Sequence, residues 1–481
     1  MATVTIDRAD IQGLIVRGHG ALRAARYVLA RIAQPAGASS WLAALADEVD
    51  DGRDRPNRSA VNVALTPSGL RKLGLPAETL AMFSREFTGG MTTAHRSRIL
   101  GDVEESAPER WSWGGPRGEE IDVLLLLYAA DEAEMSTVLT ARVAALEAGG
   151  LRVVRTLDTS PLVDYEHFGF RDGVSQPRME EIGEAPDAHT VKAGEFILGY
   201  PNGYGQFTPR PLLDTQADPH GMLPPAPEAP GNRDLGRGGS YLVLRQLSQD
   251  VRAFWEFCDR ATRRPDGSAD HAARVRLASK IVGRWPSGAP LVLAPESDRP
   301  ELAEENDFGY FAEDRHGLRC PIGAHVRRSH PRDSLDPKPG SHKSIEVGNR
   351  HRLLRRGRQY GPFVSREELL SMDAPERWDA EPRGLHFICL VGNLSRQFEF
   401  VQHTWLNNPR FDGLYDTPDP LMSPAPPGGR RFTVPAKRVR ERYNGLPRFV
   451  SVRGGAYFFL PGIRALRYLA ALNGGTSAGS A

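Results

Sequence analysis

The chain has 481 residues, of which 40% are hydrophobic and 25% are charged, an ordinary composition for a globular protein. This length corresponds to about two to four domains' worth of material. The 61 Lys and Arg residues nearly cancel the 60 Asp and Glu residues, and the net charge of +1 excludes a global basic field for nucleic acid or an anionic membrane.

Targeting and redox features are also informative. No apolar run reaches the roughly 18 residues that a transmembrane helix needs. Residues 1–7 lack the basic and apolar regions of a signal peptide and a twin-arginine motif, so we expect a cytoplasmic location. Cys258, Cys320 and Cys389 are widely spaced and form no Cys-x-x-Cys motif, which argues against a disulfide scaffold or a zinc cluster.

The first half of the chain is predicted to alternate short strands with amphipathic helices. Hydrophobic spacing predicts, in chain order, a strand over 10–16, a helix over 21–32, a strand over 60–65, a helix over 67–73, a strand over 121–128 and a helix over 131–146. Pro67 suits a first helical turn, and Gly149-Gly150 is a normal helix stop.

The second half repeats this order. Strands are predicted over 240–247, 384–391 and 456–460, and helices over 250–258 and 394–405. Strand–helix–strand units in both halves favour two ferredoxin-like α+β halves, although periodicity alone does not separate them from other α/β arrangements.

Segments rich in proline and glycine suggest the boundaries of these halves. Residues 219–237 and 416–435 are predicted to be surface loops, and 474–481 a disordered tail. The organisation we expect is an N-terminal half over 1–218 with the Asp172 segment, a connection over 219–237, and a C-terminal half over 238–473.

Two distant segments carry residues suited to chemistry. Residues 169–177 read Gly-Phe-Arg-Asp-Gly-Val-Ser-Gln-Pro, and residues 320–328 read Cys-Pro-Ile-Gly-Ala-His-Val-Arg-Arg. Glycines around Asp172 allow close approach to a flat ring, and a carboxylate there can exchange protons. Histidine is a usual ligand of haem iron, so Asp172 and His325 suggest the two faces of a haem site. Taken singly, each has an ordinary interpretation, as an Asp-Gly turn or a buried histidine.

Both segments resemble those of the dye-decolourising (DyP-type) haem peroxidases. The similarity extends over nearly the whole chain, through residues 90–91, 95–102, 111–114, 194–200, 239–243 and 404–411. The long form is most similar to the larger, advanced bacterial and fungal-like subgroup. The resemblance implies an α+β fold of the dimeric α+β barrel type, with two ferredoxin-like halves, antiparallel sheets and peripheral helices. It also implies one haem b per chain in the C-terminal half, held non-covalently because no Cys-x-x-Cys-His motif is present.

The resemblance implies roles for three residues. His325 would bind the iron, and Asp172 would carry the proton of hydrogen peroxide. The family places its distal arginine five residues before an aromatic-Gly pair, which selects Arg355 before Tyr360. Gln359 stands where family members often carry proline, and this departure leaves Arg355 and Arg356 both open.

Further residues have weaker assignments. By resemblance, Glu399 would accept a hydrogen bond from the far nitrogen of His325; otherwise it is a surface glutamate. Leu385 and Phe387 would form either walls of the distal pocket or plain core. The haem propionates would be bound by one or more of Arg327, Arg328 and Arg332. Tyr360 or Trp405 would relay a radical, and the alternative for both is an ordinary core aromatic residue.

The implied activity is a peroxidase that uses hydrogen peroxide to oxidise bulky aromatic donors, such as dyes and phenols, through an oxoferryl porphyrin-radical intermediate. Because an aspartate has a reference pKa near 3.9, we expect an acidic activity optimum. One alternative is a haem-binding or iron-releasing protein without peroxidase turnover, which needs His325 but not Asp172 and Arg355. Another is a haem-free structural protein of the same fold. The physiological reductant and the oligomeric state are left open.

Overall fold

The first half of the chain forms a ferredoxin-like unit. The computed structural model describes residues 5–182, 189–426 and 428–473. Its first unit consists of β1 (Ala24–Ile32), α2 (Pro35–Ala46), β2 (Ser59–Leu65), β3 (Val123–Ala129), α7 (Glu132–Ala148) and β4 (Leu151–Asp158). These strands are antiparallel and lie in the order β2-β3-β1-β4. The β-α-β-β-α-β order confirms the arrangement predicted for this half.

The second half repeats the same plan with larger insertions. It contains β10 (Ser240–Gln249), α8 (Val251–Thr262), β13 (Gly384–Val391), the π-helical segments η8 (Ser395–Glu399) and η9 (Val401–Leu406), and β16 (Val450–Leu460). The short strands β11 (Leu354–Arg355) and β12 (Arg358–Tyr360) pair with β13 at the sheet edge. The antiparallel order is therefore β11-β13-β10-β16, and the edge strand β11 carries one of the candidate site residues.

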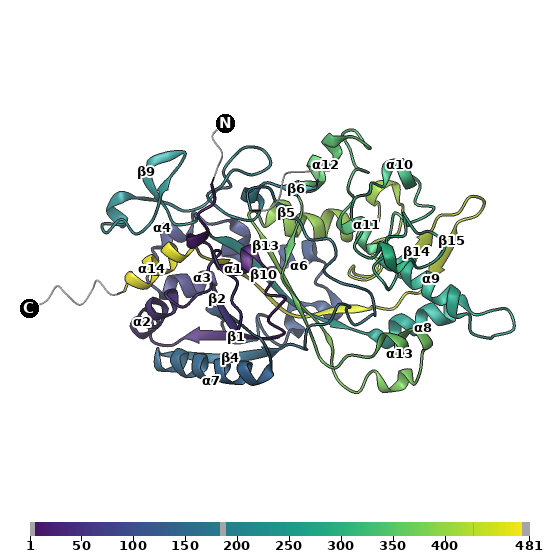
Figure 1. The fold of residues 1–481 in the computed structure, drawn as a ribbon, viewed down its shortest axis with the longest axis horizontal. Coiled ribbons are helices and arrows are strands. Elements are labelled where there is room, and N and C mark those ends of the chain that lie inside the picture. Colours follow the sequence, from purple (N-terminus) through teal and green to yellow (C-terminus); the bar gives the residue numbers. More distant parts are fainter. Residues whose placement is uncertain (1–4, 183–188, 427, 474–481) are drawn as a thin grey trace, which may run out of the picture.

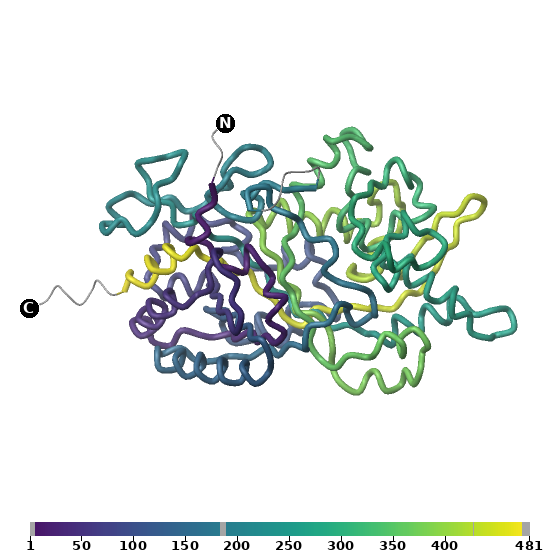
Figure 2. The backbone as a smooth tube through the Cα atoms, in the orientation of Figure 1, coloured from purple at the N-terminus to yellow at the C-terminus, as the bar shows by residue number. Residues whose placement is uncertain are grey.

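The two halves share one sheet. Strand β16 pairs with β2 where Phe459 faces Leu65, so that nine strands of the described chain form a continuous sheet. After β16, helix α14 (Ile463–Ala471) returns to the first half and packs against α2, where Figure 1 shows it beside the N-terminal helices. Figure 2 shows the same return of the C-terminal segment into the N-terminal half. The predicted boundaries at 218 and 238 stay a prediction, but the last helix of the second half lies on the first.

Shorter elements surround this sheet. The remaining α-helices are α1 (Gly13–Val16), α3 (Pro67–Lys72), α4 (Ala77–Leu80), α5 (Arg85–Gly89), α6 (Ala94–Leu100), α9 (His271–Val282), α10 (Phe311–Asp314), α11 (His325–Ser329), α12 (His342–Asn349) and α13 (Arg366–Ser371). The remaining strands are β5 (Arg178–Met179), β6 (Thr190–Val191), β7 (Leu212–Asp214), β8 (Pro225–Ala226), β9 (Ala229–Asp234), β14 (Arg431–Val434) and β15 (Glu441–Asn444).

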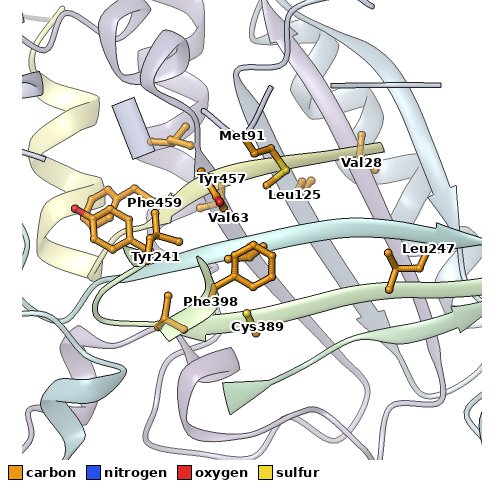
Figure 3. Packing of buried hydrophobic residues seen from close by; sticks show 14 of the residues in the cluster. Val28, Val63, Met91, Leu125, Tyr241, Leu247, Cys389, Phe398, Tyr457 and Phe459 are labelled. Atoms are coloured by element: carbon orange, nitrogen blue, oxygen red, sulfur yellow. The ribbon is translucent and has the colours of Figure 1, made fainter. Parts of the chain in front are cut away.

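The hydrophobic core lies on both faces of the shared sheet. On one face, a single cluster joins side chains of the first half, such as Val28 and Val63, to side chains of the second, such as Tyr241 and Cys389 (Figure 3). The opposite face is covered by the N-terminal segment and by residues 191–200. Full burial of one large aliphatic side chain contributes about 1.5–3 kcal/mol, so this common core stabilises the two halves together.

Two predicted elements near the N-terminus are wrong. Residues 10–16 contain the end of the 3₁₀ turn Arg8–Asp10 and helix α1 instead of a strand, and residues 24–32 form strand β1 instead of a helix. In β1, Tyr27, Val28 and Leu29 are all fully buried because β3 and β4 flank the strand and both sheet faces are covered. A nearly continuous apolar run fits helical spacing as well as strand spacing, and strand pairing decides between them.

The proline- and glycine-rich stretches contain more structure than predicted. Strands β8 and β9 lie within 219–237 and form a small sheet with β7, and β14 lies within 416–435. The predicted tail at 474–481 lies outside the described residues. Of the helices in the described ranges, none combines the length and apolarity that crossing a bilayer requires.

Candidate functional site

His325 is the first residue of α11, and its side chain is oriented by a buried carboxylate. Its Nδ1 donates to Oδ2 of Asp419 at 2.9 Å. The Asp419 side chain is fully buried, and its other oxygen accepts the backbone N–H groups of Leu421 and Met422. The imidazole itself is 29% exposed. A histidine that donates one ring nitrogen to a carboxylate has its other nitrogen directed away and ready to bind a metal.

The electrostatics of this pair favour an electron-rich imidazole. Burial alone would lower the pKa of His325, but the charge and hydrogen bond of Asp419 raise it overall, against the opposing charge of Arg355. Burial pushes the pKa of Asp419 upward, yet the interaction with His325, aided by Arg328, holds it below its usual value. The carboxylate therefore stays ionised and strengthens the histidine as a ligand.

Asp172 lies on an exposed turn that glycines make possible. Its backbone N–H donates to the carbonyl of Asp164 at 3.1 Å, and its Oδ1 accepts the N–H of Gly173 at 2.6 Å. Gly169 and Gly173 both have positive φ, at 92° and 78°. A Cβ at Gly173 would meet no atom within 4 Å, so the turn borders open space beside the carboxylate. The two glycines therefore adopt backbone angles that other residues rarely accept, as their positions around Asp172 predict.

Strand β11 distinguishes Arg355 from Arg356. Arg355 faces Cys389 across the β11–β13 pair, and paired residues project to the same face of a sheet. Cys389 belongs to the same core cluster that Leu385 and Phe387 contact. Arg356 points the other way, and its guanidinium donates to the carbonyls of Leu14 and Ile15 at 2.7 and 3.0 Å. Only Arg355 remains available on the face of the candidate site.

The Asp172 turn is tied to the segment that carries Arg355. The backbone N–H of Arg355 donates to Oε1 of Gln176 at 3.1 Å, and Arg352 donates to the carbonyl of Ser175 at 3.2 Å. These two bonds connect positions far apart in the sequence. The structure therefore brings the predicted proton carrier and the predicted arginine to one region, with His325 close enough to sense the charge of Arg355.

Leu385 and Phe387 project from β13 toward this region. They alternate with His386 and Ile388, which are buried against the opposite face. Unlike the later residues of β13, Leu385 and Phe387 are only partly buried although they contact the main core cluster. Partly exposed apolar side chains on the Arg355 face fit the apolar wall of a ring-binding site.

Two of the three arginines predicted to bind propionates are already engaged by the protein. Arg327 donates to Asp314 and to the carbonyl of Cys320, and it lies over the ring of Tyr310. Arg328 donates to the carbonyls of Trp405, Thr417 and Asn408. Both side chains are buried, and their bonds fix α11 to the surrounding loops. Nε and Nη2 of Arg327 nevertheless lack a hydrogen-bond partner, so the assignment of these arginines as propionate ligands stays a prediction.

Arg332 remains a candidate and is joined by two arginines that the sequence analysis missed. Its Nε is buried without a hydrogen-bond partner, while Nη1 donates to the carbonyls of Asn306 and Phe308. Burial, together with the charges of Arg332 and Arg355, lowers the pKa of Arg352 to about 9. Burial likewise lowers the pKa of Arg284 to about 10.

This arginine cluster lacks a protein counter-charge. Within the described ranges, no Asp or Glu side chain forms an ion pair with Arg284, Arg332, Arg352 or Arg355. Buried charges are normally paired, so the cluster is suited to anionic groups of a ligand. Haem carries two propionates, and the residues present fit that group.

Glu399 is not the hydrogen-bond acceptor of His325. Its carboxylate accepts both bonds from Nη1 of Arg96, at 2.5 and 2.7 Å, and one from the hydroxyl of Tyr457 at 2.8 Å. Asp419 takes the predicted role instead. Little in the sequence indicates this role, since Asp419 lies 94 positions after His325 in a proline-rich stretch.

Tyr360 is half-buried at the sheet edge. Its ring stacks on His386 with centroids 4.6 Å apart. Burial raises its pKa, while hydrogen bonds with Gln246 and Ser248 oppose that rise. The radical relay role stays a prediction, as does that of Trp405, which is buried against α11.

Comparison with known proteins bears on the fold and the family of this chain. No family model matches the chain. It is 32% identical to the multifunctional dye peroxidase DyP2 of Amycolatopsis sp. over 426 residues, which cover 85% of this chain and 82% of that protein. It is 29% identical to the dye-decolorizing peroxidase msp1 of Mycetinis scorodonius over 85% of this chain and 76% of that one.

Solved structures show the same architecture. The fold matches an ancestral D-type dye-decolorizing peroxidase with a TM-score of 0.76 and 26% identity, covering 96% of this chain and 99% of the other. It also matches a fungal DyP-type peroxidase from Auricularia auricula-judae with a TM-score of 0.77 over 97% of this chain and 100% of the other, where 24% identity supports likeness of fold alone. The fold and these relatives thus define an α+β peroxidase of the haem-dependent class. The chain belongs to the dye-decolourising peroxidase family.

Proposed function

We propose that this peroxidase holds one non-covalent haem b through His325 and uses hydrogen peroxide to oxidise bulky aromatic donors. The observation that carries the proposal is the 2.9 Å hydrogen bond from His325 to a buried, ionised Asp419. This hydrogen bond leaves the second ring nitrogen of His325 free, and the side chain is partly exposed. The arginines nearby form no ion pair with an Asp or Glu of the described residues.

The bound haem would supply the reduction of peroxide and the one-electron oxidation of donors, and the protein would supply binding, orientation and charge. Arg332, Arg352 and Arg284 would receive the propionates. Asp419 holds the ring of His325 in one orientation and keeps the proton of Nδ1.

Asp172 and Arg355 would act on the peroxide. The Asp172 carboxylate is exposed and accepts only the N–H of Gly173 among the hydrogen bonds described, so one oxygen is free to accept a proton and return it. The Arg355 guanidinium would stabilise negative charge that develops on the leaving oxygen. Gln176 holds the backbone of Arg355 against the Asp172 turn.

Replacement of Asp172 tests this function. Asp172→Asn keeps the shape of the side chain but removes its basicity, so we expect peroxide-dependent decolourisation of an anthraquinone dye to fall about 100-fold or more. The Soret band should be unchanged, because Asp172 does not hold the haem in this proposal.

Asp164→Asn is the matched control, since Asp164 lies in the same loop and its side chain is exposed. It should change turnover by less than about twofold. Full activity of Asp172→Asn would contradict the proposed role of Asp172. A wild-type protein with a Soret band but no turnover would instead support the haem-binding alternative. The cytoplasmic location expected from the sequence stays a prediction.

A further inference from the structure

A second pocket lies outside the candidate haem site. Its volume is about 360 Å³, and its lining includes His351, Phe400, Trp405, Leu335, Asp336 and Asp412. We call it the His351 pocket. No residue assigned above to haem or peroxide lines it apart from Trp405, whose relay role stays a prediction. The volume falls at the lower end of the roughly 300–1,000 Å³ typical of small-molecule sites.

Three aromatic side chains form one wall of the His351 pocket. The rings of His351 and Phe400 stack with centroids 4.1 Å apart and planes at 12°. Trp405 meets both edge-on, at 5.2 and 5.5 Å. Burial lowers the pKa of His351 to about 4, so this wall is uncharged at neutral pH. Uncharged aromatic faces attract both flat rings and cations.

Two carboxylates, those of Asp412 and Asp336, also line the His351 pocket. Asp412 is half-buried, and among the described residues no group donates a hydrogen bond to its carboxylate and no cation pairs with it within 4 Å. Burial raises the pKa of Asp412, the charge of Arg327 opposes the rise, and the charge of Asp336 adds to it. Asp336 is exposed. The pocket therefore combines an aromatic wall with two carboxylates that pair with no cation of the described residues within 4 Å.

The His351 pocket is separate from the arginine cluster, although the two are adjacent in the chain. His351 directs Nδ1 to the carbonyl of Arg396 at 2.6 Å, whereas Arg352 donates to His330 and Ser175. Neighbouring side chains thus serve different sites. A haem propionate is an anion and suits the arginines, while the carboxylates beside His351 would repel it.

We propose that the His351 pocket binds a small aromatic cation, such as an aryl ammonium compound. Its ring would lie against His351 and Phe400, and its positive charge beside Asp412 and Asp336. A neutral aromatic compound would gain only the apolar contact, and an aromatic anion would be repelled. The pocket would therefore select for charge as well as for ring shape.

Calorimetric titration of the haem-loaded protein tests this proposal. The probe is phenyltrimethylammonium, whose charge is permanent, and the comparison compound is benzenesulfonate, an anion of similar size. We expect one site for the cation and no comparable binding of the anion. Asp412→Asn should weaken cation binding at least about fivefold. Asparagine suits this position because Asp412 has a φ of 45°, which asparagine tolerates.

Asp373→Asn removes one exposed negative charge outside the pocket lining and is the control. It should leave the affinity unchanged, so a loss there as large as in Asp412→Asn would overturn the proposal by indicating a general charge effect. Equal affinity of Asp412→Asn and wild type, or equally tight binding of benzenesulfonate, would also overturn it. If circular dichroism and the Soret band show that Asp412→Asn does not fold, Asp336→Asn takes its place, because Asp336 is exposed. We expect this variant to bind the cation more weakly. Unchanged binding would overturn the proposal.

Discussion

At the scale of single residues, the partner of His325 controls the properties of the proposed iron ligand. Asp419→Asn removes the negative charge that raises the pKa of the imidazole. A less electron-rich imidazole stabilises ferric iron less, so the reduction potential of the haem should rise. Loss of such partners typically costs roughly 10- to 100-fold in metal affinity or activity, and we expect peroxide turnover to fall within that range. Spectroelectrochemistry and steady-state turnover measure the two effects.

Glu399→Gln is the matched control for this prediction. Glu399 bonds with Arg96 and Tyr457, so its loss should lower thermal stability without moving the reduction potential. A potential that shifts equally in both variants would show that the carboxylates act through the fold and not through His325.

A second residue-scale prediction concerns Glu166, which closes the turn before Asp172. Its carboxylate accepts the N–H groups of Phe168 and Phe170 and the side-chain amide of Gln249. Burial raises its pKa from 4.5 to about 7 despite these bonds, and the charge of Asp172 adds to the rise. The folded protein therefore holds a proton on Glu166 that the unfolded chain releases above about pH 4.5.

This raised pKa stabilises the fold at low pH, and the contribution is lost as the pH rises through about 7. At about 1.36 kcal/mol per unit, the loss is at most about 3 kcal/mol. Glu166→Gln imitates the protonated form, so its stability relative to wild type should improve between pH 5 and pH 8. Thermal unfolding of both proteins across that range measures this difference. A difference in Tm that stays constant with pH would contradict the assignment.

At the scale of elements, side chains alternate between the two faces of the sheet along β11 and the residue after it. Replacement of Arg355 should therefore affect the reaction, and replacement of Arg356 should affect stability. Arg355→Leu should slow the reaction with hydrogen peroxide about 100- to 1,000-fold while leaving thermal stability nearly unchanged. Arg356→Leu removes bonds to the carbonyls of Leu14 and Ile15 and should destabilise the fold by about 2–4 kcal/mol, with a smaller effect on the peroxide reaction.

Stopped-flow kinetics measures the rate of the peroxide reaction in both variants, and thermal unfolding measures the stability of both. The variants serve as controls for each other, because each removes one arginine from the same strand end. If Arg356→Leu were the variant that lost peroxide reactivity with its stability intact, the orientation of β11 inferred from its pairing with β13 would be wrong.

At the scale of the whole molecule, the shared sheet predicts that the halves unfold together. Leu125 lies in β3 of the first half, is 1% exposed, and belongs to the core cluster that also contains Tyr241 and Cys389 of the second half. Leu125→Ala should lower the free energy of unfolding by about 2–5 kcal/mol. Loss of the Soret band and loss of far-ultraviolet circular dichroism should shift together.

Leu318→Ala makes the same chemical change at a side chain that is 40% exposed. It should cost no more than about 0.5 kcal/mol. If Leu125→Ala moved the circular dichroism transition but left the Soret transition in place, the two halves would be independent domains, and the continuous sheet would not couple them.

Much of the fold could be predicted because local patterns agreed with the final environment. Strand β13 begins and ends where the apolar run 384–391 does, and α7 begins after Asp131, whose side chain caps it. The pattern failed for β1, because its mostly apolar residues, interrupted only by Arg26 and Arg31, contain no information about which partners will flank it. The small sheet of β7, β8 and β9 was missed for a related reason, since proline and glycine indicate turns but not the strands between them.

The candidate site was predictable where one residue type at one position had a distinctive local context. Asp172 between glycines and His325 before paired arginines stand in segments of this kind, and their roles stay predictions. Asp419 and Arg352 were missed because neither has an unusual neighbourhood in the sequence. The internal bonds of Arg327 and Arg328 could not be predicted, because proximity to His325 in the chain says nothing about the direction in which a helical side chain points.

The sequence by itself determined the two-half α+β plan, the glycine-flanked Asp172 turn and the histidine that would bind iron. The plan and the histidine were predicted from segments that resemble the dye-decolourising peroxidases, because periodicity alone did not separate the plan from other α/β arrangements. Only the tertiary structure decided which carboxylate faces His325, which arginine of β11 faces the site, and which buried arginines lack a counter-charge. Each of these depends on contacts between segments that are distant in the chain, and folding alone brings those segments within hydrogen-bond distance.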